Sequence, residues 1–401
     1  MNLAVILEHR FLGTPDGAIW TSTTFAYPFW RRYLEVFDSV RVVARVLDVP
    51  EAMNGWKRAD GESVTFAPVP YYVGPQQFLL RCGKVIQAMR RAVALEDAVI
   101  LRVPSLLANW LAPYLSRRGQ PFGLEVVGDP WDVFSPGAAK YAWPVRVFAR
   151  WWFTQELRKQ CEAAAGLAYV TQSSLQRRYP PAKRAYCARL SDVELPGLAF
   201  ASDLWTGKRE RGGSSLITVG MLEQLYKGVD VLIDAIAHCV KGGLDVRLTV
   251  VGDGRHRGAL EARCVRQGIE QRVRFLGQLP AGEPVRAQLD RADLFVLASR
   301  VEGLPRAMIE AMARGLPCIG TTVGGIPELL PPEDMVPPND AWALAAKIAA
   351  VLNDPERMVQ MSRRNYQKAL EYREELLREK RLAFYRRVRE ITEEWHQSQA
   401  A

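Results

Sequence analysis

The chain is poor in the residues that most metal and redox sites use. Its 401 residues include only four histidines, His9, His238, His256 and His396, which leaves little room for histidine-based chemistry. The six cysteines lie far apart and form no C-x-x-C pair, which argues against a zinc site or a disulfide framework and fits a reducing cytosol. Because no Asp/His cluster with metal-ligand spacing is visible either, we expect no metal and no bound cofactor.

Long apolar runs are also missing. No run approaches the roughly 18 residues that cross a bilayer. The N-terminal MNLAVILEHR has no basic leader, and its apolar stretch is too short for a signal peptide, so it predicts a buried strand in a cytoplasmic protein. With 48% apolar and 24% charged residues, the composition is that of an ordinary globular enzyme, and the length predicts two domains.

The net charge of +9 is unevenly distributed along the chain. Residues 1–200 contain 24 Lys and Arg against 17 Asp and Glu, whereas residues 201–401 contain 29 against 27. An excess in one half indicates an anionic partner, such as a phosphorylated substrate, nucleic acid or lipid headgroups, or a general solubility charge. No aromatic-basic RNA-binding motif is visible, so we expect no nucleic acid.

Apolar runs of strand length alternate with helical patterns, most regularly in the second half. After the strand-like SSLITVGML (214–222), the segment KGVDVLIDAIAHCV places Val229, Leu232, Ile233 and Ile236 at helical spacing. Further candidate strands are DVRLTVVGD, VRFLGQL, LFVLAS and PCIGTT, with helices between them. Runs that are buried on both faces and joined by helices predict parallel strands in a doubly wound sheet.

The first half repeats this scheme less regularly. Candidate strands are NLAVILE, VRVVARV, AVILRV, PFGLEVV and GLAYVT, with helices expected near 20–37, 76–94, 105–116 and 145–164. The segment 196–215, rich in Gly, Ser and charge, is the expected linker. We therefore predict an α/β protein with two Rossmann-like domains, residues 1–196 and 197–370, that face each other across a cleft at the carboxyl ends of their strands.

The segment SRVEGLPRAMIEAMARGLPCIG (299–320) contains the most informative pattern. A strand ends near Ser299, a loop holds Glu302 and Gly303, and Pro305 stands where a helix is expected to begin. The free N–H groups of the helix start favour an anion, and a carboxylate beside it is well placed to accept hydrogen bonds from sugar hydroxyls. On spacing alone, Glu310 has a second interpretation, an ion pair with Arg306 or Arg314 four residues away.

Cations at other expected helix starts support an anion site. Lys227 precedes the helix expected from about Gly228, and Arg255 and Arg257 follow VVGDG, as Arg306 follows its own loop. Cations there oppose the helix dipole unless an anion shares the site. The turn Gly252–Asp253–Gly254 fits a close approach to such a ligand, although glycines also serve turns for purely structural reasons.

Together, the segments YKGVDVLIDAIA, VVGDG, VRFLGQLP and SRVEGLPRAMIEAMARGLPCIGTTVGGIPELL resemble the donor-binding half of family-4 retaining glycosyltransferases of the GT-B fold. The signature is a pair of glutamates with seven residues between them, here Glu302 and Glu310, followed by A-x-G-x-P and G-G-x-P-E. The resemblance covers residues 214–335. It implies that a nucleotide sugar binds mainly to the second domain, with Glu310 on the ribose hydroxyls and Lys227 on the diphosphate.

The resemblance also implies roles for the surrounding residues. Glu302, Gly303 and Leu304 would contact the transferred sugar and its phosphate, with Arg306, Gly252, Asp253 and Gly254 as further donor-binding residues. The backbone near Gln278 and Leu279 would frame the base. Residues 371–401 would form a helix that packs back on the first domain.

The sequence departs from the family pattern at two places. Many relatives carry an arginine where this chain has Met221, and Arg300 or Arg306 is a candidate replacement. Many also place a histidine after the strand GLEVV, where this chain has Gly128 and Asp129. Two roles for Asp129 remain open, a contact with sugar or acceptor and a cap on the next turn.

The glycine loop of the first domain is represented only by HRFLGTPDGAIW. Gly17 and Asp16 lie near an expected helix start, and Gly17 is a candidate donor-binding residue. We interpret His9 as a structural loop residue.

The resemblance implies a metal-independent, retaining transferase, and the missing Asp/His cluster agrees with this. It would move a hexose from a nucleotide diphosphate sugar to an acceptor hydroxyl, on a lipid-linked or growing glycan in exopolysaccharide or lipopolysaccharide assembly. Glu302, Lys227 and Asp129 are the expected catalytic residues. The alternatives are an epimerase or phosphorylase of the same fold, or a non-catalytic membrane-binding protein that leaves the glutamate pair unused.

Two segments of the first half mix aromatic residues with cations. YAWPVRVFARWWFTQELRK (141–159) and FAYPFWRRY (25–33) have the composition of an interfacial helix, with rings at headgroup depth and charges on phosphates. They predict reversible attachment to an anionic membrane surface on the cytoplasmic side. The alternative is that the aromatics fill the first domain's core or line the acceptor cleft.

Overall fold

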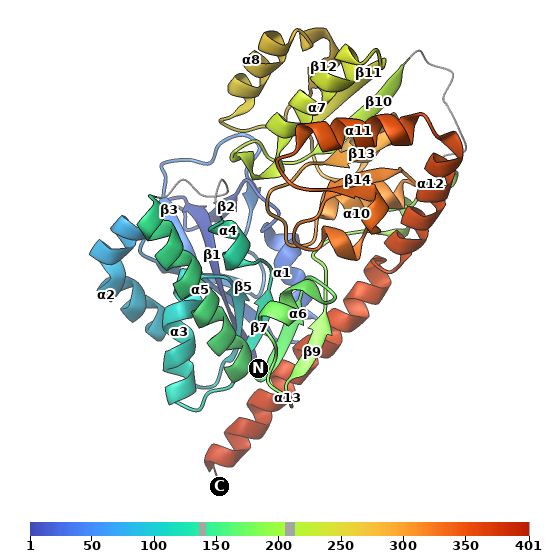
Figure 1. Ribbon diagram of the computed structural model, residues 1–401. Coiled ribbons are helices and arrows are strands. Elements are labelled where there is room, and N and C mark those ends of the chain that lie inside the picture. The colour runs from blue at the N-terminus through green and yellow to red at the C-terminus, as the bar shows by residue number, and fades with distance from the viewer. Residues whose placement is uncertain (136–141, 205–212, 401) are drawn as a thin grey trace.

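The chain folds into two α/β units, each built on its own mainly parallel sheet (Figure 1). A computed structural model describes residues 1–135, 142–204 and 213–400. The expected linker 196–215 lies in part outside these ranges. No helix of the described residues is both long and apolar enough to cross a membrane.

The first sheet has the strand order β4-β2-β1-β6-β7-β8-β9, and β3 pairs with the other side of β1 and with β5. Its strands are β1 (Asn2–Gly13), β2 (Ile19–Thr21), β3 (Ser39–Asp48), β4 (Lys57–Arg58), β5 (Val64–Val69), β6 (Ala98–Val103), β7 (Gly123–Val126), β8 (Gly166–Tyr169) and β9 (Tyr186–Arg189). All pairs are parallel except those of β2.

Helices cover both faces of this sheet, and β6, β7 and β8 are therefore buried along their whole length. One apolar core contains α2 (Gly74–Ala92), α3 (Leu106–Arg117) and α5 (Trp143–Ala163), and the other contains α1 (Tyr27–Leu34) and α13 (Glu374–Ala400). The short helices α4 (Pro130–Val133) and α6 (Ser174–Arg178) follow β7 and β8 at the carboxyl edge.

The second sheet is entirely parallel, with the order β12-β11-β10-β13-β14-β15. Its strands are β10 (Ser214–Val219), β11 (Val246–Val251), β12 (Val273–Phe275), β13 (Leu294–Leu297), β14 (Cys318–Thr321) and β15 (Met335–Val336). On one side pack α7 (Val229–Lys241), α8 (Arg257–Gln267) and α11 (Ala341–Leu352), and on the other α9 (Glu283–Leu289) and α10 (Arg306–Ala313). This is the doubly wound sheet that the alternating pattern predicted.

The chain crosses back to the first unit through α12 (Pro355–Leu370) and α13. Figure 1 shows α13 in red, running along the first unit, where it contacts β6, β8 and β9. Phe384, Tyr385 and Val388 are buried there. A Cβ on Gly123 would lie only 2.7 Å from the Val388 side chain, so a glycine in β7 admits the helix.

The N-terminal region differs from the sequence expectation. The first strand extends to Gly13 and returns as the hairpin strand β2, so α1 begins at Tyr27 instead of near residue 20. The reason is turn chemistry: Thr14 Oγ1 donates to Asp16 Oδ1 (2.5 Å), and Gly17 adopts φ +83°. Gly17 therefore lies in a hairpin turn and not at a helix start.

Candidate active site

The loop between β13 and α10 holds Glu302 in a fixed, buried position. Its side chain accepts hydrogen bonds from Lys227 Nζ (2.5 Å) and Ser299 Oγ (2.7 Å) on the same oxygen, Oε1. Only 7% of Glu302 is exposed. Pro305 lies one position before the first helical residue, in extended conformation, so α10 begins at Arg306. A buried carboxylate that is paired with a lysine is thus held at the start of a helix.

Lys227 is positioned by a turn that only glycine permits. Gly228 has φ +66°, and a Cβ there would lie 1.9 Å from the Ala298 carbonyl oxygen. The turn before α7 therefore rests directly on the loop after β13. This close approach brings the lysine from one loop to the carboxylate of the other.

Glu310 is the half-buried carboxylate on the second turn of α10. It accepts no hydrogen bond from any described residue, and the structure shows no ion pair with Arg306 or Arg314. Arg314 instead binds Asp290 at 2.6 and 2.9 Å. Burial raises the pKa of Glu310, against the opposing charges of Arg306 and Arg286. The ion-pair interpretation of Glu310 is wrong, and both of its oxygens remain available to a ligand.

The two arginines considered for the charge missing at Met221 differ in their surroundings. Arg300 binds Asp230 through two contacts of 2.8 Å and also contacts Asn339, so it is committed to the protein. Arg306 is exposed on the first turn of α10, where its charge lowers the pKa of Asp192 in the first unit. Arg306 is the better placed of the two for an anion.

The glycines after β11 make room for protein and not for a ligand. A Cβ on Gly252 would lie 1.9 Å from the Gly220 carbonyl oxygen, and one on Gly254 would lie 2.2 Å from the Glu223 nitrogen. Both have positive φ. The expectation of an open approach to a ligand at these two positions is therefore corrected, since the loop after β10 occupies that space.

The cations beside these glycines have protein partners. Arg257 binds Asp253 (3.1 Å) and Glu261 (2.8 Å), and Arg255 donates to the Glu223 carbonyl oxygen (2.8 Å). Arg255 and Arg257 therefore need no external anion: Asp253 and Glu261, each four residues away, neutralise Arg257, and Glu223 on the loop after β10 pairs with Arg255. Asp253 also accepts from the Gly254 N–H (2.8 Å).

Leu279 follows β12 beside the same loop. It is half-buried against the apolar core of the second unit, and Gly252 donates to the Gly277 carbonyl oxygen (2.8 Å) next to it. Leu279 thus lies near the Gly252 turn. It is separated from the Lys227–Glu302 pair, because β11 lies between β12, which Leu279 follows, and β10, which Lys227 follows.

The first unit meets the site at Gly303. A Cβ on this glycine would lie 3.0 Å from the Val127 carbonyl oxygen and 3.7 Å from Val170. Leu304 beside it is 8% exposed. The loop that holds Glu302 therefore touches the loops after β7 and β8, and the two sheets meet at their carboxyl edges.

Asp129 takes the second of its two possible roles. Its Oδ1 caps α4 by accepting from the Trp131 N–H (2.9 Å) and also accepts from the Tyr179 hydroxyl (2.6 Å). Its Oδ2 binds Arg178, and only 6% of the residue is exposed. With both oxygens used, Asp129 braces the loop after β7 and is not a free base; its proposed catalytic role is corrected accordingly.

His9 lies within β1 and not in a loop. Its Nε2 lies 3.3 Å from the hydroxyls of Thr21 and Thr23. Burial, helped by the charges of Arg45 and Arg10, lowers the pKa of His9 to about 4. At neutral pH it is an uncharged, structural side chain.

Glu328, in the G-G-x-P-E segment, is a residue beside the site for which the sequence analysis predicts no role. From the second unit it accepts hydrogen bonds from the backbone N–H groups of Gln172, Ser173 and Ser174 (2.6–2.8 Å) and from the Ser174 hydroxyl (2.7 Å). Burial alone would raise the pKa of Glu328, but these hydrogen bonds lower it.

The turn that carries Glu328 is also joined to the Glu302 loop. Gly325 donates to the Gly303 carbonyl oxygen (2.7 Å), and a Cβ on Gly324 would lie 1.9 Å from the Glu302 carbonyl oxygen. The first unit is thus hydrogen-bonded, through one short turn, to the loop that holds the buried carboxylate.

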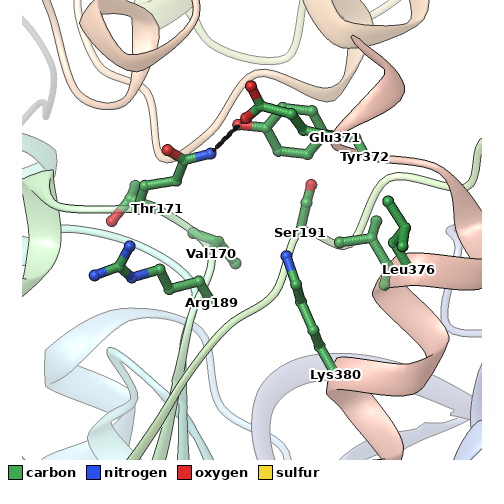
Figure 2. A pocket seen from close by; sticks show the side chains of 10 residues that line it. Val170, Thr171, Arg189, Ser191, Glu371, Tyr372, Leu376 and Lys380 are labelled. Carbon is green, nitrogen blue, oxygen red and sulfur yellow. Dashed lines mark hydrogen bonds between the residues drawn. The ribbon is translucent and has the colours of Figure 1, made fainter. Parts of the chain in front are cut away.

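A cavity of about 290 Å³ lies behind this contact, where α12 and α13 cross to the first unit (Figure 2). Lys380 extends from α13 toward Ser191, and Arg189 of β9 lines another side of the cavity. The Gln172 side chain donates to Glu371 (3.1 Å) at its edge. Its lining includes none of the predicted donor residues.

A buried charge network lies inside the first unit, where α13 packs on the sheet. Arg102 in β6 binds Glu125 in β7 and Asp192 after β9 (2.6 Å to Asp192), and the Tyr33 hydroxyl donates to Glu125 at 3.0 Å. Although burial alone would raise the pKa of Asp192, the arginines hold it far below its ordinary value. The sequence signal was present: a charge inside each of the apolar strands AVILRV and GLEV.

The described residues hold no group of three His, Cys, Asp or Glu side chains that is arranged to bind a metal ion.

The whole-chain likeness to solved structures defines the fold. Sucrose-phosphate synthase from Thermosynechococcus elongatus superposes with a TM-score of 0.70 over 97% of this chain and 99% of that structure, at 19% identity. Anabaena Alr3699/HepE in complex with UDP-glucose gives 0.63 over 98% and 100%, at 15% identity. Two facing parallel sheets with a helix crossing back are the GT-B architecture, as predicted.

The second unit has its own family match. Residues 213–354 match the family model described as glycosyl transferases group 1. The chain thus contains a group 1 glycosyltransferase domain within a GT-B fold.

Curated relatives agree with this assignment. CapJ of Staphylococcus aureus is 26% identical over 333 residues, which cover 82% of this chain and 81% of that protein. WcaL of Escherichia coli (strain K12), named as a colanic acid biosynthesis glycosyltransferase, is 34% identical over 40% of this chain and 48% of its own. A Corynebacterium glutamicum enzyme, named as a GDP-mannose-dependent monoacylated phosphatidylinositol monomannoside mannosyltransferase, is 34% identical over 34% and 37%.

Proposed function

We propose that the protein transfers a hexose from a nucleotide diphosphate sugar to an acceptor hydroxyl, with retention of anomeric configuration and without a metal ion. One observation carries the proposal. The buried Glu302, held by Lys227 and Ser299, and Glu310, which has no hydrogen-bond partner among the described residues, flank the start of α10 where the first unit touches the second.

Glu310 would accept hydrogen bonds from the ribose hydroxyls, since its two oxygens have free acceptor capacity. Lys227, Arg306 and the first N–H groups of α10 would bind the diphosphate, because a helix start and adjacent cations favour negative charge. Glu302 with the backbone of Gly303 and Leu304 would orient the transferred sugar. Leu279 would frame the base at the other end of the donor.

The same groups would stabilise the diphosphate as it departs. Negative charge grows on its oxygen as the bond to the sugar breaks, and fixed cations and helix dipoles stabilise that charge without a metal. Among the described residues, Asp129 and His9 are both committed to other contacts. The acceptor oxygen would therefore attack from the face that the diphosphate leaves and lose its proton to a diphosphate oxygen.

The substrate classes rest on the named relatives. HepE is described with UDP-glucose, which supports a nucleotide-sugar donor. WcaL is named for colanic acid biosynthesis and the C. glutamicum mannosyltransferase for a monoacylated phosphatidylinositol mannoside, which together support a glycan or lipid-linked acceptor. We place this reaction at the cytoplasmic face of a membrane, in polysaccharide or lipopolysaccharide assembly.

A thermal-shift panel tests the donor site. A ligand that binds only the folded state raises its melting temperature, so one of UDP, GDP or ADP, and its sugars, is expected to raise Tm. Lys227→Ala should remove most of the shift, whereas Lys241→Ala, an exposed lysine at the end of α7, should keep it. If no nucleotide or nucleotide sugar shifts Tm, the donor site is wrong; if the sugar nucleotide is epimerised instead of consumed, the reaction class is wrong.

A further inference from the structure

The N-terminal half of α5 is exposed although most of its residues are apolar. The exposed fractions are 69% for Trp143, 61% for Phe148 and 56% for Trp151, with 48% for both Val145 and Val147. A contiguous apolar surface of this kind on a folded protein normally marks a place where something else binds. The sequence alternative, that these aromatics fill the core, is thus wrong for this half of the helix.

The neighbouring helix α4 extends the surface. Trp131 is 39% exposed, and the Arg150 guanidinium lies 3.7 Å from its ring centroid while Arg150 Nε donates to the Trp131 carbonyl oxygen (2.8 Å). These contacts join α4 to α5. We call the resulting surface the aromatic rim: Trp131, Trp143, Phe148 and Trp151 with the cations Arg146 and Arg150.

The other aromatic segment, residues 25–33, takes no part. Phe29, Trp30 and Tyr33 are 8%, 0% and 0% exposed and belong to the core beneath β1 and α13. The core interpretation holds for this segment.

Along α5 and α2, cations border the aromatic rim and outnumber the acids; Asp132 on α4, beside Trp131, is paired with Arg178. Residues 143–155 contain Arg146 and Arg150 and no Asp or Glu. On the same face of the sheet, α2 carries Arg81, Lys84, Arg90 and Arg91 and no acid along its 19 residues, and its Leu80 is 86% exposed. The surface thus combines apolar side chains with an unbalanced positive charge.

The position of the rim relates it to the site. In a parallel α/β unit, helices begin at the carboxyl edge of the strands, and this edge of the first unit touches Gly303 of the second. Figure 1 shows that α5 begins at this edge. The rim therefore lies beside the acceptor half of the site.

We propose that the aromatic rim and α2 bind an anionic membrane surface and hold the acceptor side of the site toward a lipid-linked acceptor. Tryptophan and phenylalanine rings insert at headgroup depth, while adjacent arginines bind lipid phosphates. The purpose of this contact rests on the proposed function, but the binding itself does not. A second copy fits less well, because a symmetric dimer would set Arg146 and Arg150 against the same cations.

Vesicle co-sedimentation of the full chain tests the surface. Binding to phosphatidylglycerol–phosphatidylcholine vesicles is expected at low salt, with little binding to phosphatidylcholine alone and strong loss at high salt. The variant Phe148→Ser/Trp151→Ser should bind at least tenfold less. The matched control is Trp342→Ser, since Trp342 is 71% exposed on α11 in the second unit.

A cation variant tests the charge. Lys84, Arg91 and Arg146 have no ion-pair partner among the described residues, so all three are replaced by glutamine, with Lys241, Arg247 and Arg274 of the second unit as the control set. At about 1 kcal/mol, or roughly fivefold, per cation near an anionic surface, the rim set should lose roughly a hundredfold and the control set little.

Three outcomes overturn the proposal: no binding of the wild type to anionic vesicles at low salt, equal loss in control and rim variants, or a dimer that the rim variants convert to a monomer. The nucleotide Tm shift is measured on every variant. Vesicle binding without any nucleotide shift would overturn the proposed function and leave the membrane surface standing.

Discussion

Glu310 is a carboxylate that the protein buries by half and leaves without a hydrogen bond among its described residues. Desolvating a charge without a partner is costly, so this side chain lowers the stability of the free protein and strengthens binding of a ligand that donates to it. We expect Glu310→Ala to weaken donor binding roughly tenfold or more, since hydrogen bonds to charged groups contribute about 1.5–3 kcal/mol.

Calorimetric titration with the nucleotide that shifts Tm checks this prediction. Glu270→Ala, at an exposed carboxylate before β12, is the matched control and should bind normally. Wild-type affinity in Glu310→Ala would show that the carboxylate does not contact the donor.

His9 gives a prediction about pH. Its pKa is about 4 in the folded protein against about 6.5 in an unfolded chain, so between these values the unfolded state binds a proton that the folded state does not. The free energy of unfolding should therefore decrease as the pH falls from 6.5 to 4. Urea unfolding at several pH values should show that His9→Gln loses this part of the dependence; parallel curves for variant and wild type would contradict it.

At single residues, the sequence was informative where function fixes spacing. The interval between Glu302 and Glu310 and the glycine after Lys227 placed these residues at the starts of α10 and α7, where the structure has them; their roles stay predictions. Arg255 and Asp129 were misjudged because their partners, Glu223 and Arg178 with Tyr179, are set by loop packing that periodicity does not report. For Arg257 the signal was present, since Asp253 and Glu261 lie four residues to either side of it.

Among the elements, the turn from β14 to Glu328 connects the two units. Glu328 holds the start of α6 while the glycines before it hold the Glu302 loop. We expect Glu328→Gln to lower kcat at least tenfold and to leave the nucleotide Tm shift nearly unchanged. The N–H groups at the start of α6 now share two carboxylate oxygens of Glu328, whereas a glutamine offers them only one acceptor oxygen.

Glu328 also has a pH signature. Its lowered pKa means that its stabilising contribution is complete above the ordinary glutamate pKa and is lost as the pH falls through the lowered value. The wild type should lose this contribution in acid, and Glu328→Gln should not. Glu333→Gln, an exposed glutamate five residues on, serves as control.

For the kinetic prediction, a fall in donor affinity equal to the fall in kcat would assign Glu328 to donor binding instead.

Elements were predictable where burial is uniform. Five of the six strands of the second sheet were predicted from apolar runs because helices cover both faces; the two-residue β15 was not. The β1–β2 hairpin was missed because β1 continues past its pairing with β6, which ends at Ile6, to a turn that Thr14 and Asp16 decide through their own hydrogen bonds.

For the whole molecule, we predict that transfer needs no metal ion and that it retains the anomeric configuration of the donor sugar. Transfer should persist in excess EDTA, because cations and a helix start stabilise the departing diphosphate. NMR of the product should show the anomeric configuration of the donor. Loss of activity on chelation with recovery on adding manganese or magnesium would contradict the first, and an inverted linkage the second.

The placement of α13 bears on how the protein is made. Phe384, Tyr385 and Val388 complete the core beneath β7 and β8, and the Tyr385 hydroxyl lies 3.3 Å from Glu125 in the buried charge network. A growing chain leaves the ribosome from its N-terminus, so the first sheet emerges some 200 residues before the helix that covers it. Until then, the apolar face of the first sheet and its buried charges remain uncovered. The sheet of the second unit is continuous in sequence, so this unit can finish folding first during synthesis.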